Sequence, residues 1–279
     1  MIAESWVLGG ELPVRRLGFG TAQLTGPGYW GPRGDARDAV AVLRRAVERG
    51  VTLIDTADNY GPSIAEELIA EALYPYADGL VIATKGGVVR TGADAWHVDG
   101  RPERLRAMCE ASLRRLRLDT VDLYQLHRLD PGVPMADQLG ALDALRAEGK
   151  IRHIGLDTVT AGELRAALEL TDIASVQNRY NLLDRACEPL LALCAARGIA
   201  FLPWFPLGNG ALTADPVCAR IAAAHGATPG QVALSWLLHH SPALCPTPGT
   251  GSRDHLDENL DAASVRLTDD DLARLDAPA

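Results

Sequence analysis

Four polar side chains lie at or just beyond the ends of apolar segments in the first half of the chain. Asp55 closes "VTLID", Lys85 closes "LVIATK" and His127 closes "VDLYQLH", while Tyr60 follows Asp55 in "DNYGP". A carboxylate, an amine, an imidazole and a phenol are groups that hold or transfer protons in enzymes. Taken singly, an aspartate here can cap a loop, and a tyrosine or histidine can pack at a rim. A lysine that ends an apolar strand is harder to explain, because it must find a partner or reach solvent.

Together, these groups are suited to acid catalysis. A free tyrosine loses its proton near pH 10, so it is a weak acid at neutral pH. We expect a cationic lysine nearby to stabilise the phenolate and lower the pKa of the tyrosine, with an aspartate keeping the lysine charged and oriented. A histidine can hydrogen-bond the substrate oxygen. Such a set can donate a proton to a carbonyl oxygen while another group delivers hydride to the carbon.

Short apolar runs alternate with amphipathic segments along the whole chain. This alternation predicts an α/β fold, a single (β/α)8 TIM barrel, in which every strand brings its carboxyl end to the same face. An open doubly wound sheet is the alternative, but no G-x-G-x-x-G follows the first apolar run. The predicted strands are residues 17–21, 51–55, 80–85, 121–127, 151–156, 174–178, 199–204 and 243–247.

Residues that start and stop helices punctuate the segments between these runs. Asp35 is a predicted N-cap and Gly50 a C-terminal stop; Pro102 suits a first helical turn, and Gly149 ends the next helix. Residues 6–18 predict a hairpin that turns at Gly9-Gly10 and plugs the amino-terminal end of the barrel. We expect residues 1–279 to form one domain. Later helices are predicted at residues 161–170, 186–197, 216–225, 229–240 and 254–262.

Composition excludes several classes of protein. The chain has 279 residues, 36 acidic against 27 basic, and a formal net charge of −9 without a basic run, which argues against nucleic acid or anionic membrane partners. No apolar stretch is long enough to span a membrane, and the amino terminus does not have the pattern of a secretory signal. The 5 scattered cysteines predict reduced thiols and a cytoplasmic protein. A monomer is the default expectation.

The chain resembles the aldo-keto reductase family. The set Asp55, Tyr60, Lys85 and His127, in "IDTADNYG", "TKGG" and "YQLH", is similar to the catalytic tetrad of that family, and "GTAQL", "VQNRYNL" and "PGTGSRDHLDENL" extend the resemblance over nearly the whole chain. "GPGYWGP" and "EALYPYADGL" look closest to its bacterial pyridoxal reductase-like subgroup. The resemblance implies that Tyr60 is the general acid, that Lys85 and Asp55 tune it, and that His127 orients a small-molecule carbonyl substrate.

By the same resemblance, the hydride comes from a nicotinamide cofactor that lies across the barrel mouth. Trp204 would stack on the nicotinamide, Gln177 would bind its carboxamide, and Glu258 and Asn259 would contact the adenine. The helix expected near residue 254 suits phosphate binding at its amino terminus. The implied cofactor-binding residues are Gly20, Thr21, Asp157, Thr158, Gln177, Trp204, Leu207, Gly208, Gly249, Thr250, Ser252, Arg253, His255, Glu258 and Asn259.

Two departures from the family pattern bear on this cofactor. Asp157-Thr158 stands where the family usually has Ser-Asn gripping the carboxamide; an aspartate can accept from the amide, but it can also simply cap a loop. Gly249 and His255 stand where many members place lysine and arginine around the 2′-phosphate, so Arg253 would have to supply the charge. NADPH is favoured over NADH.

Aromatic residues in two loops suggest a flat aromatic or bulky apolar substrate. Tyr29, Trp30 and Trp96 are the predicted substrate contacts, although they could equally be lid packing. The subgroup likeness suggests reduction of a pyridoxal-like aldehyde, and a carbonyl- or imine-reducing step in a biosynthetic pathway is the alternative. A metal-dependent hydrolase would need a motif such as His-x-His after the first strand, and "GFGTAQL" has none. A non-catalytic nicotinamide-binding regulatory protein is the remaining alternative.

Overall fold

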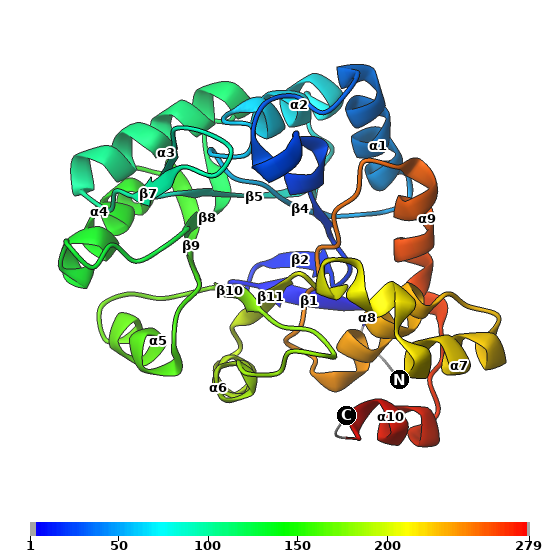
Figure 1. The fold of residues 1–279 in the computed structure, drawn as a ribbon. Helices are drawn as coiled ribbons and strands as arrows, with labels where there is room; N and C mark the ends of the chain where they lie inside the picture. The colour runs from blue at the N-terminus through cyan, green and yellow to red at the C-terminus, as the bar shows by residue number, and fades with distance from the viewer. Residues whose placement is uncertain (1–3, 278–279) are drawn as a thin grey trace.

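A curved parallel sheet forms the centre of the molecule (Figure 1). The computed structural model describes residues 4–277. The sheet has 7 strands in the order β11-β10-β9-β8-β5-β4-β3, so strands that follow one another among the predicted runs lie side by side. Its strands are β3 (Phe19–Gly20), β4 (Leu53–Asp55), β5 (Val81–Gly86), β8 (Val121–Leu126), β9 (Ile151–Asp157), β10 (Ser175–Arg179) and β11 (Ala200–Trp204).

The predicted strand at residues 243–247 occupies its expected place but forms no continuous ladder. It pairs with β11 through a single parallel bridge, in which the Phe201 amide donates to Ala243 O and the Cys245 amide donates to Phe201 O, each at 2.8 Å. On its other side, the amide of Gly18 donates to Pro246 O at 3.0 Å. Pro246 has no N–H to extend a ladder, nor does Pro248 just beyond the segment. The barrel therefore closes at this seam through a few isolated backbone hydrogen bonds, two with β11 and one with Gly18.

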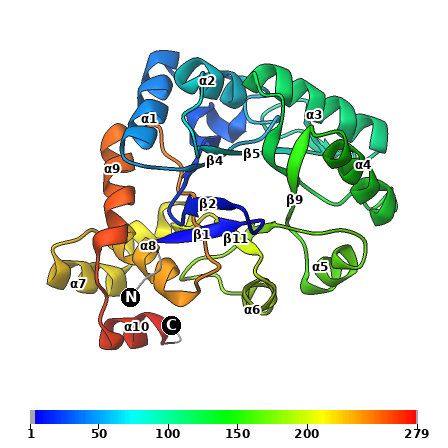
Figure 2. The ribbon, with the colours of Figure 1, turned by 180° about the vertical axis from the view of Figure 1, so that it is seen from behind.

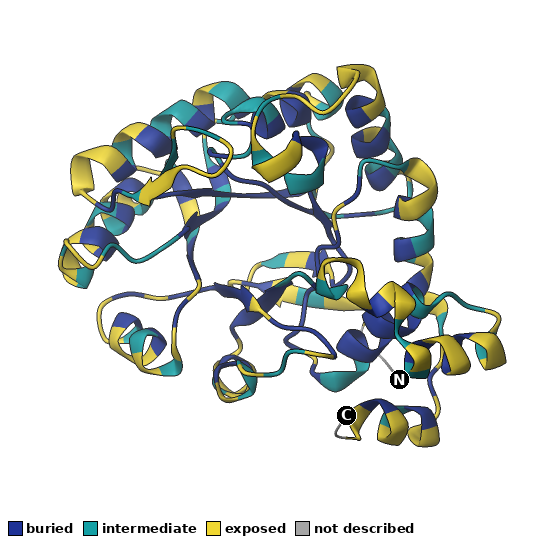
Figure 3. Cartoon of the chain, in the orientation of Figure 1, coloured by how far each residue is buried: buried dark blue, intermediate teal, exposed yellow. Residues whose placement is uncertain are grey.

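Helices surround the sheet, with their buried faces toward it and their exposed faces outward (Figure 3). The described part of the chain also contains four 3-10 turns, at Ala22–Leu24, Pro27–Tyr29, Gly208–Ala214 and Ala262–Ser264. The helices are α1 (Ala36–Glu48), α2 (Ile64–Leu73), α3 (Pro102–Leu116), α4 (Met135–Ala147), α5 (Ala161–Leu168), α6 (Glu188–Arg197), α7 (Pro216–His225), α8 (Pro229–His240), α9 (Arg253–Asp261) and α10 (Asp269–Asp276). No helix within residues 4–277 is long and apolar enough to cross a membrane.

The predicted helix boundaries hold where a capping residue marks them. The Asp35 side chain accepts from the backbone N–H of Arg37 at 2.9 Å, and Pro102 opens α3. Gly50 and Gly149 follow α1 and α4 with φ of +85° and +75°, a backbone region that glycine adopts without strain. Helix α10 was not predicted, although Thr268 and Asp271 form the capping box that starts it.

The predicted amino-terminal hairpin is present and covers the amino-terminal end of the barrel. Strands β1 (Ser5–Leu8) and β2 (Leu12–Arg15) pair antiparallel, and Figure 2 shows them in front of the barrel when it is seen from behind. Leu8 and Val14 are buried in one apolar cluster with barrel residues that include Leu53 and Leu202. The hairpin thus completes the apolar filling of the barrel, away from the carboxyl ends of the strands.

A second hairpin, which the sequence did not indicate, follows β5. Strands β6 (Val88–Arg90) and β7 (Trp96–Val98) pair antiparallel, with Arg90 opposite Trp96. Because β5 ends immediately before it, this hairpin rises from the carboxyl-end face of the barrel, beside the ends of β4 and β8.

The plug function of the first hairpin can be tested at two adjacent residues. Leu8 is 0% exposed and Val7 is 50% exposed on the same strand. We expect Leu8→Ala to lower the free energy of unfolding by about 2–5 kcal/mol, because it leaves a cavity in the barrel filling. Val7→Ala should change it by less than about 0.5 kcal/mol. Guanidinium unfolding of both variants measures this, and equal effects at the two positions would refute the plug.

Candidate active site

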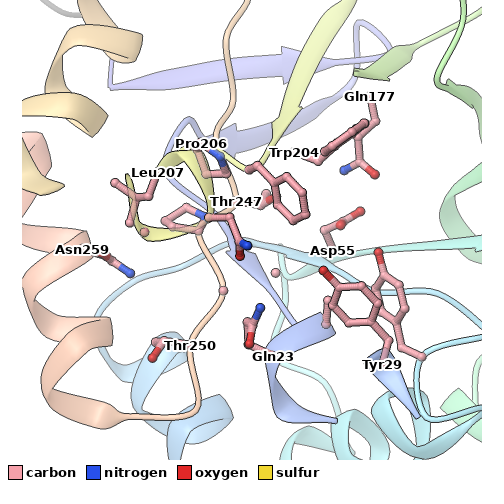
Figure 4. Close-up of a pocket in the computed structure, with 18 of the residues that line it drawn as sticks. Gln23, Tyr29, Asp55, Gln177, Trp204, Pro206, Leu207, Thr247, Thr250 and Asn259 are labelled. Carbon is pink, nitrogen blue, oxygen red and sulfur yellow. The ribbon is translucent and has the colours of Figure 1, made fainter. Parts of the chain in front are cut away.

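The carboxyl ends of the strands surround a pocket of about 610 Å³. Figure 4 shows Tyr29, Asp55, Trp204 and Gln177 on one side of this pocket, and Thr250 and Asn259 on the opposite side. The predicted site residues that line it are Gly20, Tyr29, Asp55, Tyr60, His127, Asp157, Gln177, Trp204, Leu207, Gly249, Thr250, His255, Glu258 and Asn259.

Lys85 lies just behind the pocket wall in a buried ion pair. Its side chain is 0% exposed, and Nζ lies 2.8 Å from each carboxylate oxygen of Asp55 and 2.9 Å from Thr56 O. The Gln125 amide also donates to Asp55 Oδ1 at 3.1 Å. Burial alone would lower the pKa of Lys85, but Asp55, with smaller contributions from Tyr60 and Asp157, more than offsets the burial, and the pKa is raised. The lysine is therefore a fixed cation at neutral pH.

Tyr60 lies between this cation and the pocket. Lys85 Nζ is 5.2 Å from the centroid of the Tyr60 ring, and the ring packs edge-on against His127 at a centroid distance of 6.1 Å. Burial raises the pKa of Tyr60 to about 12, and the charge of Lys85 opposes this rise. The expectation that the pKa of Tyr60 is lowered is therefore wrong, because desolvation of the phenolate outweighs the attraction of Lys85.

His127 is held neutral. Burial is the main reason that its pKa lies well below the ordinary range, and the positive charges of Lys85, Arg128 and Arg90 add to the effect. Its Nδ1 is buried and has no hydrogen-bond partner, and its Nε2 lies 3.8 Å from Asp157 Oδ2. A neutral imidazole has one N–H to donate, so His127 is able to hydrogen-bond an oxygen in the pocket without carrying charge.

Asp157 faces the pocket, but Arg128 holds it. Arg128 Nη1 and the Thr158 hydroxyl each donate to Asp157 Oδ1 at 2.7 Å. Burial raises the pKa of Asp157 to about 6, against the opposing charge of Arg128. Both of these donors bond to Oδ1 of Asp157, so Oδ2 is the oxygen left to accept a hydrogen bond from the amide of a ligand. Thr158 has a φ of +55° and does not line the pocket.

Two glycines let backbone form the floor of the pocket. A Cβ at Gly20 would lie 2.6 Å from Thr247 O, and one at Gly249 would lie 2.5 Å from Gly20 O. Any larger residue would push these two segments apart. Thr21, next to Gly20, is buried behind the floor, where its hydroxyl donates to Thr56 Oγ1 at 2.8 Å.

The segment that leads into α9 forms the far end of the pocket. Ser252 caps the helix by accepting from the His255 amide at 3.4 Å, and Thr250 Oγ1 accepts from the Ser252 amide at 3.1 Å. Thr250 and His255 line the pocket, but Ser252 does not. Arg253 lies in a separate groove on the outer face with Arg37, so the structure does not bring it to the pocket.

Two of the three predicted substrate residues lie outside the pocket. Tyr29 lines it, with its ring centroid 5.9 Å from that of Tyr60. Trp30 and Trp96 are 38% and 54% exposed and do not line it. Gly208 also lies outside it, whereas its neighbours Leu207, Asn209 and Gly210 contribute to the wall.

Several wall residues were missed by the sequence analysis. Arg128 directly follows His127 in "QLHRL", so the same strand end could have indicated it. Arg90 and Phe205 had no such signal, because the unpredicted hairpin and a turn with φ of +54° place them. The residues missed are Ala22, Gln23, Arg90, Arg128, Phe205, Pro206, Asn209, Gly210, Thr213, Gly230, Thr247 and Pro248.

Comparison with known proteins gives consistent matches. The profile described as the Aldo/keto reductase family matches residues 16–278. An uncharacterized oxidoreductase of Schizosaccharomyces pombe is 45% identical over 269 residues, covering 96% of this chain and 87% of its own. Pyridoxine 4-dehydrogenase of Escherichia coli (strain K12) is 40% identical over 284 residues, covering 99% of this chain and 98% of its own.

Solved structures share the fold over almost the full length. A glycerol dehydrogenase from Gluconobacter oxydans superposes with a TM-score of 0.90 at 26% identity, covering 99% of this chain and 95% of its own. An aldo-keto reductase from Klebsiella pneumoniae in complex with NADPH superposes with a TM-score of 0.86 at 28% identity, with the same coverage of 99% and 95%.

The neutral state of His127 predicts a pH dependence of stability. A histidine with a lowered pKa in the folded state binds fewer protons there than in the unfolded chain, so its contribution is complete above about pH 6.5 and is lost as the pH falls. We expect the free energy of unfolding of the wild type to fall more steeply between about pH 6.5 and pH 5 than that of His127→Gln. Denaturant unfolding at several pH values measures both slopes.

Asp157 contributes a slope of the opposite sign, because a raised carboxyl pKa stabilises the fold at low pH and this stabilisation is lost as the pH rises toward about 6. The wild type and His127→Gln both contain Asp157, so the difference between their pH slopes of unfolding free energy reports mainly on His127. His97→Gln, at an exposed histidine of β7, controls for loss of an imidazole outside the pocket. Parallel curves for the wild type and His127→Gln would contradict a buried neutral His127.

Proposed function

The chain belongs to the aldo/keto reductase family of NAD(P)H-dependent oxidoreductases, and we propose that it reduces an aldehyde or ketone with NADPH, using Tyr60 as the proton donor. The observation that carries this proposal is the buried pair of Lys85 and Asp55. It holds a fixed ammonium group 5.2 Å from the ring centroid of a tyrosine in the pocket wall. A cation buried beside a phenol makes loss of the phenol proton easier, and binding alone does not need this property.

The pocket suits an extended dinucleotide. Its floor is backbone at Gly20 and Gly249, and the amino terminus of α9 lies at one end. When bound, the nicotinamide supplies hydride to the carbonyl carbon. Gln177 and Oδ2 of Asp157 would hold the carboxamide, and Trp204 would lie against the ring.

The opposite end of the pocket would hold the rest of the cofactor. Leu207 and the adjoining backbone would receive the pyrophosphate, and Glu258 and Asn259 the adenine. Glu258 is already positioned by the Thr228 hydroxyl, which donates to Oε1 at 2.6 Å. His255 is the wall residue suited to a 2′-phosphate, and NADPH in the Klebsiella pneumoniae relative supports NADPH over NADH.

The proton transfer follows from the electrostatics of Tyr60. With a pKa of about 12, the phenol of Tyr60 is protonated at neutral pH and has a proton to donate. An alkoxide forming on the substrate is a stronger base than this phenolate, so the proton moves from Tyr60 Oη to the substrate oxygen. The phenolate left behind is stabilised by the ammonium of Lys85. Neutral His127 would donate its N–H to the same oxygen and fix its position.

Aromatic side chains shape the wall where the carbonyl would lie. Tyr29, Trp204 and Phe205 line this part, so a flat aromatic aldehyde is the proposed substrate class. The 40% identical pyridoxine 4-dehydrogenase supports a pyridoxal-like compound within that class.

We propose a cytoplasmic location because all five cysteines are free.

The proposal predicts a separation of rate from binding at Tyr60. Tyr60→Phe should reduce kcat for pyridoxal or benzaldehyde by about 10²–10⁴-fold, because it removes the proton but keeps the ring. Its Kd for NADPH should stay within about twofold, since the ring still fills the wall. Absorbance of NADPH measures turnover, and quenching of protein fluorescence measures binding.

Tyr74→Phe is the matched control, because Tyr74 is an exposed tyrosine outside the pocket. Equal losses of rate and affinity in Tyr60→Phe would contradict the assigned role. Tight NADPH binding by the wild type without turnover of any aldehyde would instead favour a nicotinamide-binding regulatory protein.

A further inference from the structure

We propose that Arg90 recognises an anionic group on the substrate, so that the preferred substrates are aromatic aldehydes carrying a carboxylate or phosphate. This inference rests on the proposed carbonyl reduction and narrows its substrate class. Arg90 is the last residue of β6 and lines the pocket.

Local contacts fix the guanidinium of Arg90 in place. It lies 5.4 Å above the centroid of the Tyr29 ring, and its Nη1 donates to Gly28 O at 2.8 Å and to Ala93 O at 3.0 Å. Its Nε is buried and has no acceptor, and nothing in residues 4–277 accepts a hydrogen bond from Nη2. The side chain is thus held rigidly, and because the buried Nε is shielded from the pocket, Nη2 is the donor left to bind an oxyanion.

Arg90 is also the cation at this end of the pocket that has no carboxylate counter-ion. Lys85 is paired with Asp55 and Arg128 with Asp157, at 2.8 and 2.7 Å. Arg90 forms no ion pair with any carboxylate in the described part of the chain. A half-buried cation without a counter-ion is unfavourable unless an anion joins it. Its charge also reaches the reaction centre, since it contributes to lowering the pKa of His127.

The position of Arg90 fits one end of a small aromatic substrate. Arg90 packs on Tyr29, and the Tyr29 ring lies 5.9 Å from that of Tyr60, so a single aromatic ring separates the cation from the proton donor. A benzene ring bearing an aldehyde and a carboxylate has comparable dimensions. The phosphates of NADPH are proposed for the opposite side, toward Thr250 and Asn259 (Figure 4), so they would not neutralise Arg90.

The test compares acid and ester forms of the same aldehydes. The 3- and 4-carboxybenzaldehydes and their neutral methyl esters are assayed with NADPH, and kcat/KM for each acid is divided by that for its ester. We expect Arg90→Met to lower this acid-to-ester ratio by about tenfold or more, because a hydrogen-bonded charge is lost. Arg90→Lys should retain part of the ratio, since it keeps the charge but not the planar fork.

Arg117→Met is the matched control. Arg117 lies 5.4 Å above the ring of Tyr74, the same arrangement as Arg90 on Tyr29, but it does not line the pocket. Its acid-to-ester ratio should equal that of the wild type. Thermal unfolding shows whether each variant is folded.

A second measurement needs no variant. Benzoate should inhibit ester reduction by the wild type competitively, with an inhibition constant about tenfold or more below that of benzamide. An unchanged acid-to-ester ratio in folded Arg90→Met, or equal inhibition by benzoate and benzamide, would overturn the role of Arg90 while leaving carbonyl reduction intact. Failure of the wild type to turn over any acid or ester would contradict the proposed function, and this inference with it.

Discussion

The buried ion pair between Lys85 and Asp55 is the interaction on which the site depends. A lysine that is fully buried needs a carboxylate within hydrogen-bonding distance, because removing either partner leaves an uncompensated charge in the interior. The pair exists because β4 and β5 are adjacent and Asp55, at the end of β4, lies opposite Ala83, two residues before Lys85 on the same face of β5. Lys85 in turn lies opposite Gln125 on β8, whose amide also donates to Asp55. A shift of one residue in this register would turn Lys85 to the other face of the sheet.

The pair sets the properties of the groups around it. Burial makes the phenolate of Tyr60 costly, and the ammonium of Lys85 offsets part of that cost. The tyrosine is therefore protonated before the reaction, and the phenolate that remains after proton transfer is stabilised. The same cation helps to keep His127 neutral. Arg128 and Asp157 neutralise each other beside it, which leaves Arg90 as the positive charge facing the substrate.

The sequence predicted the parts of the structure that strand ends and capping residues determine. Asp55, Lys85 and His127 could be placed together because parallel strands end on one face, and Asp35, Pro102 and Gly149 marked helix boundaries. Contacts made by loops could not be predicted, since they depend on tertiary packing: Trp30 and Trp96 lie outside the pocket, and Arg90 enters it from an unexpected hairpin. The regular strand expected at residues 243–247 is reduced to a single bridge, with prolines at and just beyond its end.

The central claim is that Lys85 makes Tyr60 a better acid than its buried surroundings would allow. The most direct measurement is the ionisation of a fluorinated tyrosine at position 60, followed by ¹⁹F NMR in the wild-type background and in Asp55→Asn/Lys85→Met, which removes the ion pair without leaving a buried charge. The account predicts that the ionisation midpoint rises in the double variant, because the lowering of the Tyr60 pKa by Lys85 exceeds the raising by Asp55. A midpoint that stays the same or falls when the pair is removed would contradict it.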